Sequence, residues 1–139
     1  MEARVTLARG LHFDVVLKDS GYRLEIDTAP EHGGTAPGAR PMELVLGGLA
    51  GCTAFDVVSI LRKARQEVTG FDVIANGERA TEDPKVYTHI TVEYVVRGHN
   101  ISEEVLRRAI LLSEEKYCSV AAMLSKTARI ETRYRIIEE

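Results

Sequence analysis

The feature that most constrains this chain is a central segment that is apolar on nearly every face. Pro41 suits the first position of a helix, because its ring fixes φ and its missing N–H would have no partner there. We predict a helix from Pro41 to about Gln66, and its part between Leu44 and Ile60 is apolar all round. Such a helix belongs in the interior of a protein. This segment therefore forms the centre of the predicted structure.

This helix contains three glycines within a stretch of five residues, Gly47, Gly48 and Gly51. Each costs a helix interior roughly 1 kcal/mol relative to alanine. A sequence keeps three of them where another backbone comes close, as in a pair of helices across a two-fold axis. The strands that precede the helix cannot cover it alone. We therefore predict an obligate homodimer.

Alternating apolar and polar residues flank the helix on both sides. Residues 3–27 show three such runs separated by short turns, which predicts a three-stranded antiparallel meander. Residues 28–40 are rich in glycine and proline and form a loop. Residues 71–78 and 87–96 alternate again around a turn at 82–84, which predicts a β-hairpin of long strands.

Two further helices and a strand complete the predicted order. Ser102 caps an amphipathic helix, a break follows at residues 117–120, and a short helix runs to about Lys126. Residues 129–137 alternate as a final strand. The order βββ-α-ββ-α-α-β is an α+β pattern with no internal repeat, and we predict one domain over residues 1–139.

Size and charge narrow the classes of function. The chain has a mass of 15.4 kDa, 45% hydrophobic residues and a net charge of −3, which is typical of one globular domain and lacks the basic excess of a nucleic-acid binder. Residues 1–14 hold no apolar stretch of signal-peptide length, and the nearly uncharged run at 44–55 is too short to span a bilayer. We predict a cytoplasmic protein without nucleic-acid or membrane partners.

The two cysteines, Cys52 and Cys118, are 66 residues apart, which fits neither a CxxC redox motif nor a zinc site. We therefore expect no metal. Taken alone, Cys52 is a core thiol that burial makes inert. Cys118 begins a new helical turn, where backbone N–H groups stabilise a thiolate. Local features thus favour Cys118 as the nucleophile, although the commonest role of a buried cysteine is to fill the core.

Two segments resemble a known family. Residues 41–57, PMELVLGGLAGCTAFDV, and residues 115–120, EKYCSV, are similar to the two signature segments of the OsmC/Ohr family, the osmotically inducible and organic hydroperoxide resistance proteins. The resemblance covers essentially the whole chain, including the element order and the spacing of the cysteines. It implies an OsmC-like intertwined homodimer, in which two long central helices pack together and antiparallel sheets of both subunits wrap around them.

The resemblance also implies a thiol peroxidase in oxidative stress defence, without metal or organic cofactor. In the family the cysteine of the central helix, here Cys52, attacks the O–O bond of an organic hydroperoxide and becomes a sulfenic acid. The second cysteine, here Cys118, resolves it as a disulfide, which a dithiol reduces. Sulfenic acids condense readily with nearby thiols. The resemblance thus reverses the local ranking of the two cysteines.

One position departs from the family pattern. Hydroperoxidases of the family carry a glutamate that pairs with an arginine to stabilise the thiolate, but this chain has Met42 there and Glu43 one residue later. One residue is about 100° of rotation on a helix, so Glu43 either supports the site or only favours the helix N-terminus. Among the arginines of the first strands, Arg9 lies nearest the family's position.

Two hypotheses from different classes remain open. Both cysteines lie in full motifs, which favours a peroxidase, whereas the missing glutamate favours a non-catalytic thiol module that binds ligands or senses oxidants. Asp56, one turn beyond Cys52, is interpreted as a cap or a subunit contact rather than a site acid. The four histidines, His12, His32, His89 and His99, are interpreted as ordinary surface or sheet residues.

Overall fold

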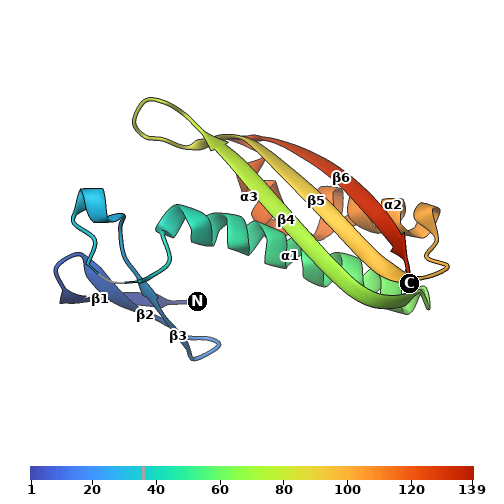
Figure 1. Cartoon of the computed structure of the whole chain (residues 1–139), viewed down its shortest axis with the longest axis horizontal. Helices are drawn as coiled ribbons and strands as arrows, with labels where there is room; N and C mark the ends of the chain where they lie inside the picture. The colour runs from blue at the N-terminus through green and yellow to red at the C-terminus, as the bar shows by residue number, and fades with distance from the viewer. Residues whose placement is uncertain (36) are drawn as a thin grey trace. The chain divides into compact units, whose positions relative to one another are not determined.

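The computed structural model describes residues 1–35 and 37–139. The chain forms two compact units, Met1–Val45 and Leu46–Glu139, and each has its own three-stranded sheet. The predicted α+β order is confirmed, with two short additions: a 3₁₀ turn, η1, at Pro30–His32 and a π-helical turn, η2, at Ser113–Tyr117. Figure 1 shows the elements in chain order. The prediction of a single domain over residues 1–139 stays a prediction.

The first unit is the predicted antiparallel meander. Its strands are β1 (Ala3–Arg9), β2 (His12–Leu17) and β3 (Tyr22–Ile26), paired in the order β1-β2-β3. Both turns use a glycine with positive φ, Gly10 at 50° and Gly21 at 74°, a conformation that costs other residues energy. The meander is thus set by local turn chemistry.

The central helix, α1, spans Pro41–Lys63, so it begins at the predicted residue and ends three residues before the predicted Gln66. The helix stops because Arg65 adopts a left-handed conformation at φ 58°, and the Gln66 N–H turns back to the Leu61 carbonyl at 2.9 Å. At the other end, the Glu43 carboxylate accepts a hydrogen bond of 2.9 Å from the Arg40 N–H. That contact satisfies a donor at the start of the helix.

The sheet of the second unit consists of β4 (Glu67–Arg79), β5 (Tyr87–His99) and β6 (Arg129–Glu138), in the order β4-β5-β6. The predicted hairpin is confirmed, and both of its strands extend to 13 residues. Strand β6 pairs with β5 in parallel, which requires a crossover connection. The helices between them provide it, and α1 and these helices lie on one face of the sheet (Figure 1).

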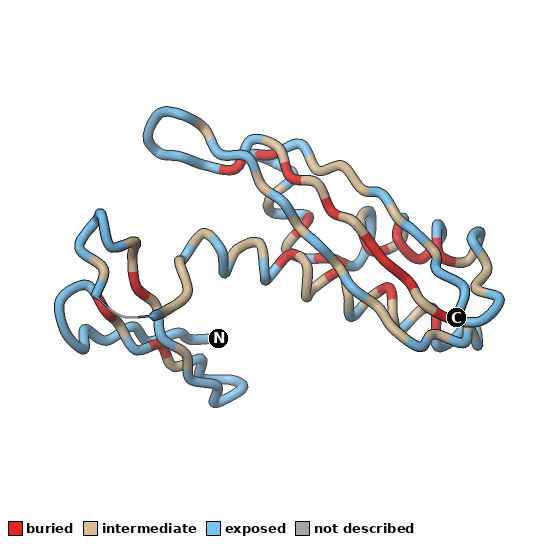
Figure 2. Tube along the Cα trace, viewed as in Figure 1, coloured by how far each residue is buried: buried red, intermediate tan, exposed pale blue. Residues whose placement is uncertain are grey.

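Buried residues of this unit gather along β5 and on one side of α1 (Figure 2). The fully buried side chains of β5 include Ile90, Val92, Tyr94 and Val96, which alternate along the strand. Those of α1 are Leu49, Thr53, Val57 and Leu61, spaced four apart. The core therefore lies between the central strand and a single stripe of the helix.

Within the single chain, α1 is not covered on every face. Phe55 is 79% exposed, because one sheet covers only one side of a helix. By length and composition α1 could cross a membrane, with a mean hydropathy of 1.9 over 18 residues, of which 22% are buried. The judgement that the nearly uncharged run at 44–55 is too short to span a bilayer underestimated the length of the apolar helix. Asp56 interrupts the uncharged run but does not end the helix.

The crossover contains α2 (Glu103–Leu112), η2 and α3 (Ser119–Leu124). Ser102 caps α2 as predicted, since its side chain accepts a hydrogen bond from the Val105 N–H at 3.3 Å. The predicted break near residues 117–120 is confirmed, but the π-helical turn before it was not foreseen. Such turns occur mostly within helices at functional sites.

Candidate active site

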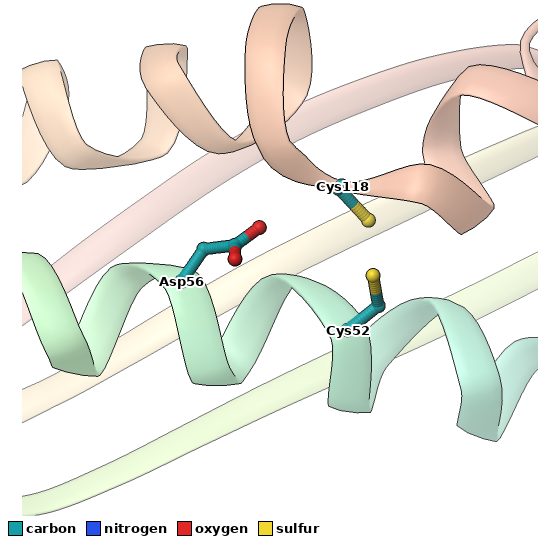
Figure 3. A group of neighbouring side chains, drawn as sticks. All are labelled: Cys52, Asp56 and Cys118. Carbon is teal, nitrogen blue, oxygen red and sulfur yellow. The ribbon is translucent and has the colours of Figure 1, made fainter.

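The fold brings Cys52, Asp56 and Cys118 together. Cys52 and Asp56 lie one turn apart on α1, and Cys118 lies between η2 and α3. The two sulfurs and a carboxylate oxygen of Asp56 are all within 4.8 Å of one another. Figure 3 shows the two thiols pointing toward each other, with the carboxylate beside them. Both cysteines are free thiols, so the structure shows a dithiol pair from distant parts of the chain.

The π-helical turn positions Cys118. The Cys118 N–H donates to the Ser113 carbonyl at 2.8 Å, which closes the turn. Cys118 then caps α3, since its sulfur accepts a hydrogen bond from the Ala121 N–H at 3.4 Å. The extra residue of a π-turn rotates the chain relative to a regular helix. This local geometry turns the Cys118 side chain toward α1.

Burial controls the ionisation of Cys118, whose residue is only 3% exposed. Burial above all, with smaller contributions from the nearby Cys52 and Asp56, raises the pKa of its thiol to about 11 against the opposing effect of the Ala121 N–H. Burial outweighs the helix N-terminus at Cys118, which speaks against the local ranking of Cys118 as the better nucleophile, and that ranking stays a prediction. With a pKa of about 11 the Cys118 thiol is protonated at neutral pH.

A chain of buried hydroxyl groups ends at Asp56. Ser113 Oγ donates to Asp56 Oδ2 at 2.9 Å and lies 2.8 Å from Thr53 Oγ1, which lies 2.7 Å from the Tyr94 hydroxyl. Each hydroxyl has a single proton to donate. Because Ser113 uses its proton on Asp56, Thr53 must donate to Ser113 and Tyr94 to Thr53. Burial raises the pKa of Tyr94 to about 12, so Tyr94 keeps the proton that it donates.

The sequence analysis missed most of the residues in this hydrogen-bonded series of hydroxyl groups. Asp56 had been interpreted as a cap or a subunit contact, yet its carboxylate accepts from Ser113 beside the two thiols. A signal existed for Asp56, because residues four apart share one face of a helix. Ser113 and Tyr94 gave no signal, since only the packing of α1 against β5 and η2 brings them to Thr53.

The two predicted supporting residues lie in the first unit. Glu43 binds the Arg40 N–H at the start of α1. Arg9 ends β1 opposite His12, where its charge opposes protonation of that histidine. Within the first unit, Glu43 thus contacts the start of α1, and Arg9 lies opposite His12. A role of Arg9 or Glu43 in activating the thiolate stays a prediction.

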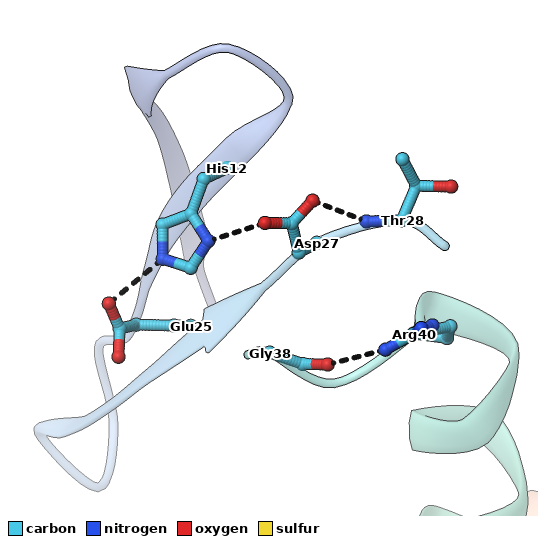
Figure 4. Close-up of polar contacts among 6 residues, drawn as sticks. All are labelled: His12, Glu25, Asp27, Thr28, Gly38 and Arg40. Carbon is cyan, nitrogen blue, oxygen red and sulfur yellow. Dashed lines mark hydrogen bonds and ion pairs between the residues drawn. The ribbon is translucent and has the colours of Figure 1, made fainter. Parts of the chain in front are cut away.

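His12 is a buried ion-pair centre and not an ordinary surface residue, as Figure 4 shows. Its side chain has no exposed surface, and its ring binds Asp27 at 2.8 Å through Nδ1 and Glu25 at 2.9 Å through Nε2. Hydrogen bonds to Glu25 and Asp27 raise its pKa. The sequence did not reveal this cluster, because His12 lies on β2 whereas Glu25 lies on β3 and Asp27 directly follows β3.

Among the residues that the structure describes, distance alone would allow two groups to hold a metal ion. They are Cys52 with Asp56 and Cys118, and His12 with Asp14 and Glu25. Thiolates and imidazoles suit soft or borderline ions. The expectation of a site without metal therefore stays a prediction, and the close pair of thiols supports redox chemistry without one.

Comparisons with known proteins identify the family of this chain. The family model described as OsmC-like protein matches residues 32–133. Protein YhfA of Escherichia coli K12 is 42% identical over 137 residues, which cover 99% of this chain and 98% of YhfA. The crystal structure of a hypothetical protein from Aquifex aeolicus VF5 is 31% identical, with a TM-score of 0.86 and coverage of 99% and 96%.

A more distant relative has the same fold. An organic hydroperoxide resistance protein OsmC from Legionella pneumophila matches with a TM-score of 0.69 at 13% identity, over 96% of this chain and 94% of that one. The resemblance inferred from residues 41–57 and 115–120 is thus confirmed by the family model, the fold and a full-length relative. The chain belongs to the OsmC-like protein family.

Proposed function

We propose that this protein is a thiol peroxidase that reduces organic hydroperoxides. Membership of the OsmC-like family supports a role related to peroxide stress. The observation that carries the finer proposal is the pair of free thiols, Cys52 and Cys118, brought within 4.8 Å by separate elements. Two of the solved structures that share the fold are described as organic hydroperoxide resistance proteins, from Legionella pneumophila and Elizabethkingia anophelis.

The proposed reaction has three steps. The Cys52 thiolate attacks the O–O bond of the hydroperoxide, which gives a Cys52 sulfenic acid and an alkoxide that takes up a proton to become an alcohol. The Cys118 thiol then displaces the sulfenic hydroxyl, so that a disulfide and water form. A dithiol finally reduces the disulfide and is itself oxidised. An S–S bond is about 2 Å long, so a small movement of the two side chains brings the sulfurs to bonding distance.

The test is treatment of the reduced protein with one equivalent of cumene hydroperoxide, followed by mass spectrometry and a dithiol-coupled turnover assay. We expect the loss of two hydrogens, a peptide linked through Cys52 and Cys118, and steady turnover. Cys52→Ser should abolish hydroperoxide consumption, whereas Cys118→Ser should still consume one equivalent. If hydroperoxide leaves both wild-type thiols unmodified, the proposal is wrong.

A second candidate is a non-catalytic thiol module that binds ligands or senses oxidants. Glu43, the candidate for the family's activating glutamate, binds the Arg40 N–H at the helix start, which favours this reading. The same assay separates the two functions. A sensor forms the disulfide once without sustained turnover, whereas a peroxidase consumes hydroperoxide as long as the dithiol lasts.

We also propose that the protein is a homodimer. Phe55 on α1 is 79% exposed, and a Cβ atom added at Gly47, Gly48 or Gly51 would meet nothing within 4 Å apart from its chain neighbours and the nearby backbone of the helix itself. A second copy would cover this apolar, glycine-bearing face. Sedimentation equilibrium should give twice the chain mass of 15.4 kDa at micromolar concentration. A folded species at the mass of one chain would contradict the dimer.

We propose the cytoplasm as the location, because a partner subunit accounts for the apolar face of α1 without a membrane. Thiols used for turnover also need a compartment that keeps them reduced. Cell fractionation should find the protein with the soluble fraction. Its recovery in the membrane fraction after a high-salt wash would contradict this location and favour insertion of α1.

A further inference from the structure

We propose that Asp56 transfers the proton in the resolving step, taking it from the Cys118 thiol and delivering it to the hydroxyl that leaves the Cys52 sulfenic acid. This inference rests on the proposed peroxidase function and deepens it. Nothing in the family resemblance assigns Asp56 a role. The inference comes from the position of its carboxylate beside the two sulfurs and from the hydroxyl chain that holds it.

The step balances with one proton and no outside reagent. The S–S bond between Cys118 and Cys52 forms as the S–O bond of the sulfenic acid breaks. The sulfenic sulfur is reduced and the Cys118 sulfur is oxidised, each to the disulfide level. The leaving hydroxide needs one proton to become water, and the attacking thiol must lose one. A single carboxylate that faces both sulfurs can therefore act first as base and then as acid.

Asp56 meets the geometric requirement. It lies one turn beyond Cys52 on α1, and its carboxylate is within 4.8 Å of both sulfurs. Figure 3 shows the carboxylate turned toward Cys118. A gap of this size is closed by one bridging water or by a side-chain rotation, both of which are usual in resting active sites.

Cys118 needs a base, because burial keeps it protonated. With its pKa raised to about 11, roughly one thiol in ten thousand is ionised at pH 7. The titratable groups that act on Cys118 are Cys52 and Asp56 from α1, and those that act on the nearby Tyr94 of β5 include Asp56 and Glu114 of η2. Each of them carries or can gain negative charge, which disfavours a resting thiolate. Attack must therefore be coupled to removal of the proton.

The hydroxyl chain holds the carboxylate in place. Ser113 donates to Asp56 Oδ2, and Thr53 and Tyr94 stand behind Ser113 in the same chain. Hydrogen bonds that are linked in this way strengthen one another. They hold the carboxylate in place beside the two sulfurs. Ser113 is accordingly a positioning residue, and Asp56 is the group that exchanges the proton.

The main test compares wild type with Asp56→Asn after one equivalent of cumene hydroperoxide. Quenching at short times with dimedone traps sulfenic acid, and mass spectrometry counts trapped and disulfide-linked protein. We expect Cys52 sulfenic acid to form at least as fast in the variant, because a negative charge has been removed. Disulfide formation should slow by about 100-fold, which is typical of the loss of an acid–base group. Equal rates of disulfide formation would overturn the inference.

The pH profile excludes a merely structural effect. Without the carboxylate, resolution depends on the small fraction of Cys118 that is already ionised. The rate in Asp56→Asn should therefore rise about tenfold per pH unit from pH 7 to 9, while the wild-type rate changes much less. Recovery at high pH would also show that the variant is folded. A slowed variant with the wild-type pH profile would overturn proton transfer by Asp56.

Two further variants serve as controls. Asp56→Glu keeps the carboxylate and should resolve within about tenfold of wild type, a rescue typical of an acid–base residue. Glu115→Gln removes the same charge from an exposed position of η2 and should resolve at the wild-type rate. A failure of Asp56→Glu to recover any activity above Asp56→Asn, in a variant with wild-type thermal stability, would contradict the inference.

A disulfide reagent tests Asp56 independently of hydroperoxide chemistry. Dithionitrobenzoate first forms a mixed disulfide at Cys52, and attack by Cys118 then releases a second coloured thiolate. That second phase requires only deprotonation of Cys118, and it should be slowed in Asp56→Asn. In one outcome, hydroperoxide fails to oxidise the wild-type protein while the rate of the second phase still depends on Asp56. That outcome would contradict the proposed peroxidase function and would support the role of Asp56 as a base. A second phase that is unaffected by Asp56→Asn contradicts that role.

Discussion

At the scale of single residues, burial and partners together decide the charge of each group. Cys118 is buried beside a thiol and a carboxylate, so its neutral form is favoured. His12 is also buried, but both of its ring nitrogens face carboxylates, so its charged form is favoured. The same amount of burial thus has opposite consequences for charge, because the partners differ.

His12 gives the protein a stability that depends on pH. Its folded-state pKa is raised above 6.5, so its contribution is complete below pH 6.5 and is lost as the pH rises through the folded-state pKa. We expect the difference in melting temperature between wild type and His12→Gln to shrink as the pH rises above 6.5. Thermal melts followed by circular dichroism check this. A difference that instead grows as the pH rises would contradict the charged state of His12.

The two thiols should differ in their reaction with an alkylating agent. Cys118 is buried and its pKa is about 11, whereas Cys52 is partly exposed. We therefore expect the first equivalent of iodoacetamide at pH 7.5 to modify Cys52 at least tenfold more often, because alkylation requires an accessible thiolate. Peptide mass spectrometry gives the ratio. Preferential modification of Cys118 would restore the ranking from local sequence.

At the scale of elements, α1 and η2 position the residues of the candidate site, and each differs from a regular amphipathic helix. Helix α1 buries one stripe in the second unit and leaves Phe55 exposed. Turn η2 adds a residue that closes onto Ser113 and points Cys118 toward α1. Thr53 and Ser113 join the two elements through their hydroxyl groups.

Replacing Ser113 by alanine should weaken the junction of α1 and η2. The change removes the donor to Asp56 and the acceptor of Thr53 in a fully buried place. We expect the free energy of unfolding to fall by about 2 kcal/mol, the usual cost of unpaired buried polar groups. Urea unfolding measures it. Ser125→Ala is the matched control, because Ser125 is exposed, and it should change stability by less than about 0.5 kcal/mol.

At the scale of the whole molecule, the chain has two compact units, and neither buries all of its apolar surface. Strand β1 of the first unit is exposed along its whole length, including Val5 at 52% and Leu7 at 59%. In the second unit, the exposed side of α1 carries the glycines and Phe55. Large apolar faces of this kind usually mark an interface, which agrees with the proposed homodimer.

A single bulky residue on α1 tests the proposed dimer interface without altering the fold of the single chain. A Cβ atom added at Gly48 would meet nothing within 4 Å beyond its chain neighbours and the nearby backbone of α1, so we expect Gly48→Leu to leave the helix content unchanged. It should instead obstruct close helix pairing and shift the sedimentation mass toward one chain at micromolar concentration. Gly48→Ala is the control, since a methyl group suits a helix better than glycine. An unshifted Gly48→Leu dimer would place the interface elsewhere.

Much of the fold follows from local sequence signals. The meander, the start of α1 at Pro41, the cap at Ser102 and the order of elements were all predicted, because turns, caps and alternation act over a few residues. The π-helical turn was missed, since it depends on how the crossover packs. The length of β4 and β5 was underestimated because strand pairing extends alternation beyond what each strand shows alone.

The sequence by itself determined the class of the protein, its two thiols and the apolar helix that carries one of them. Only the tertiary structure decided which groups surround those thiols. It placed Asp56 beside both sulfurs, buried Cys118 and linked Ser113, Thr53 and Tyr94 into one chain. The physical reason is range: secondary structure follows from neighbours along the chain, whereas burial and ionisation depend on groups that meet only after packing.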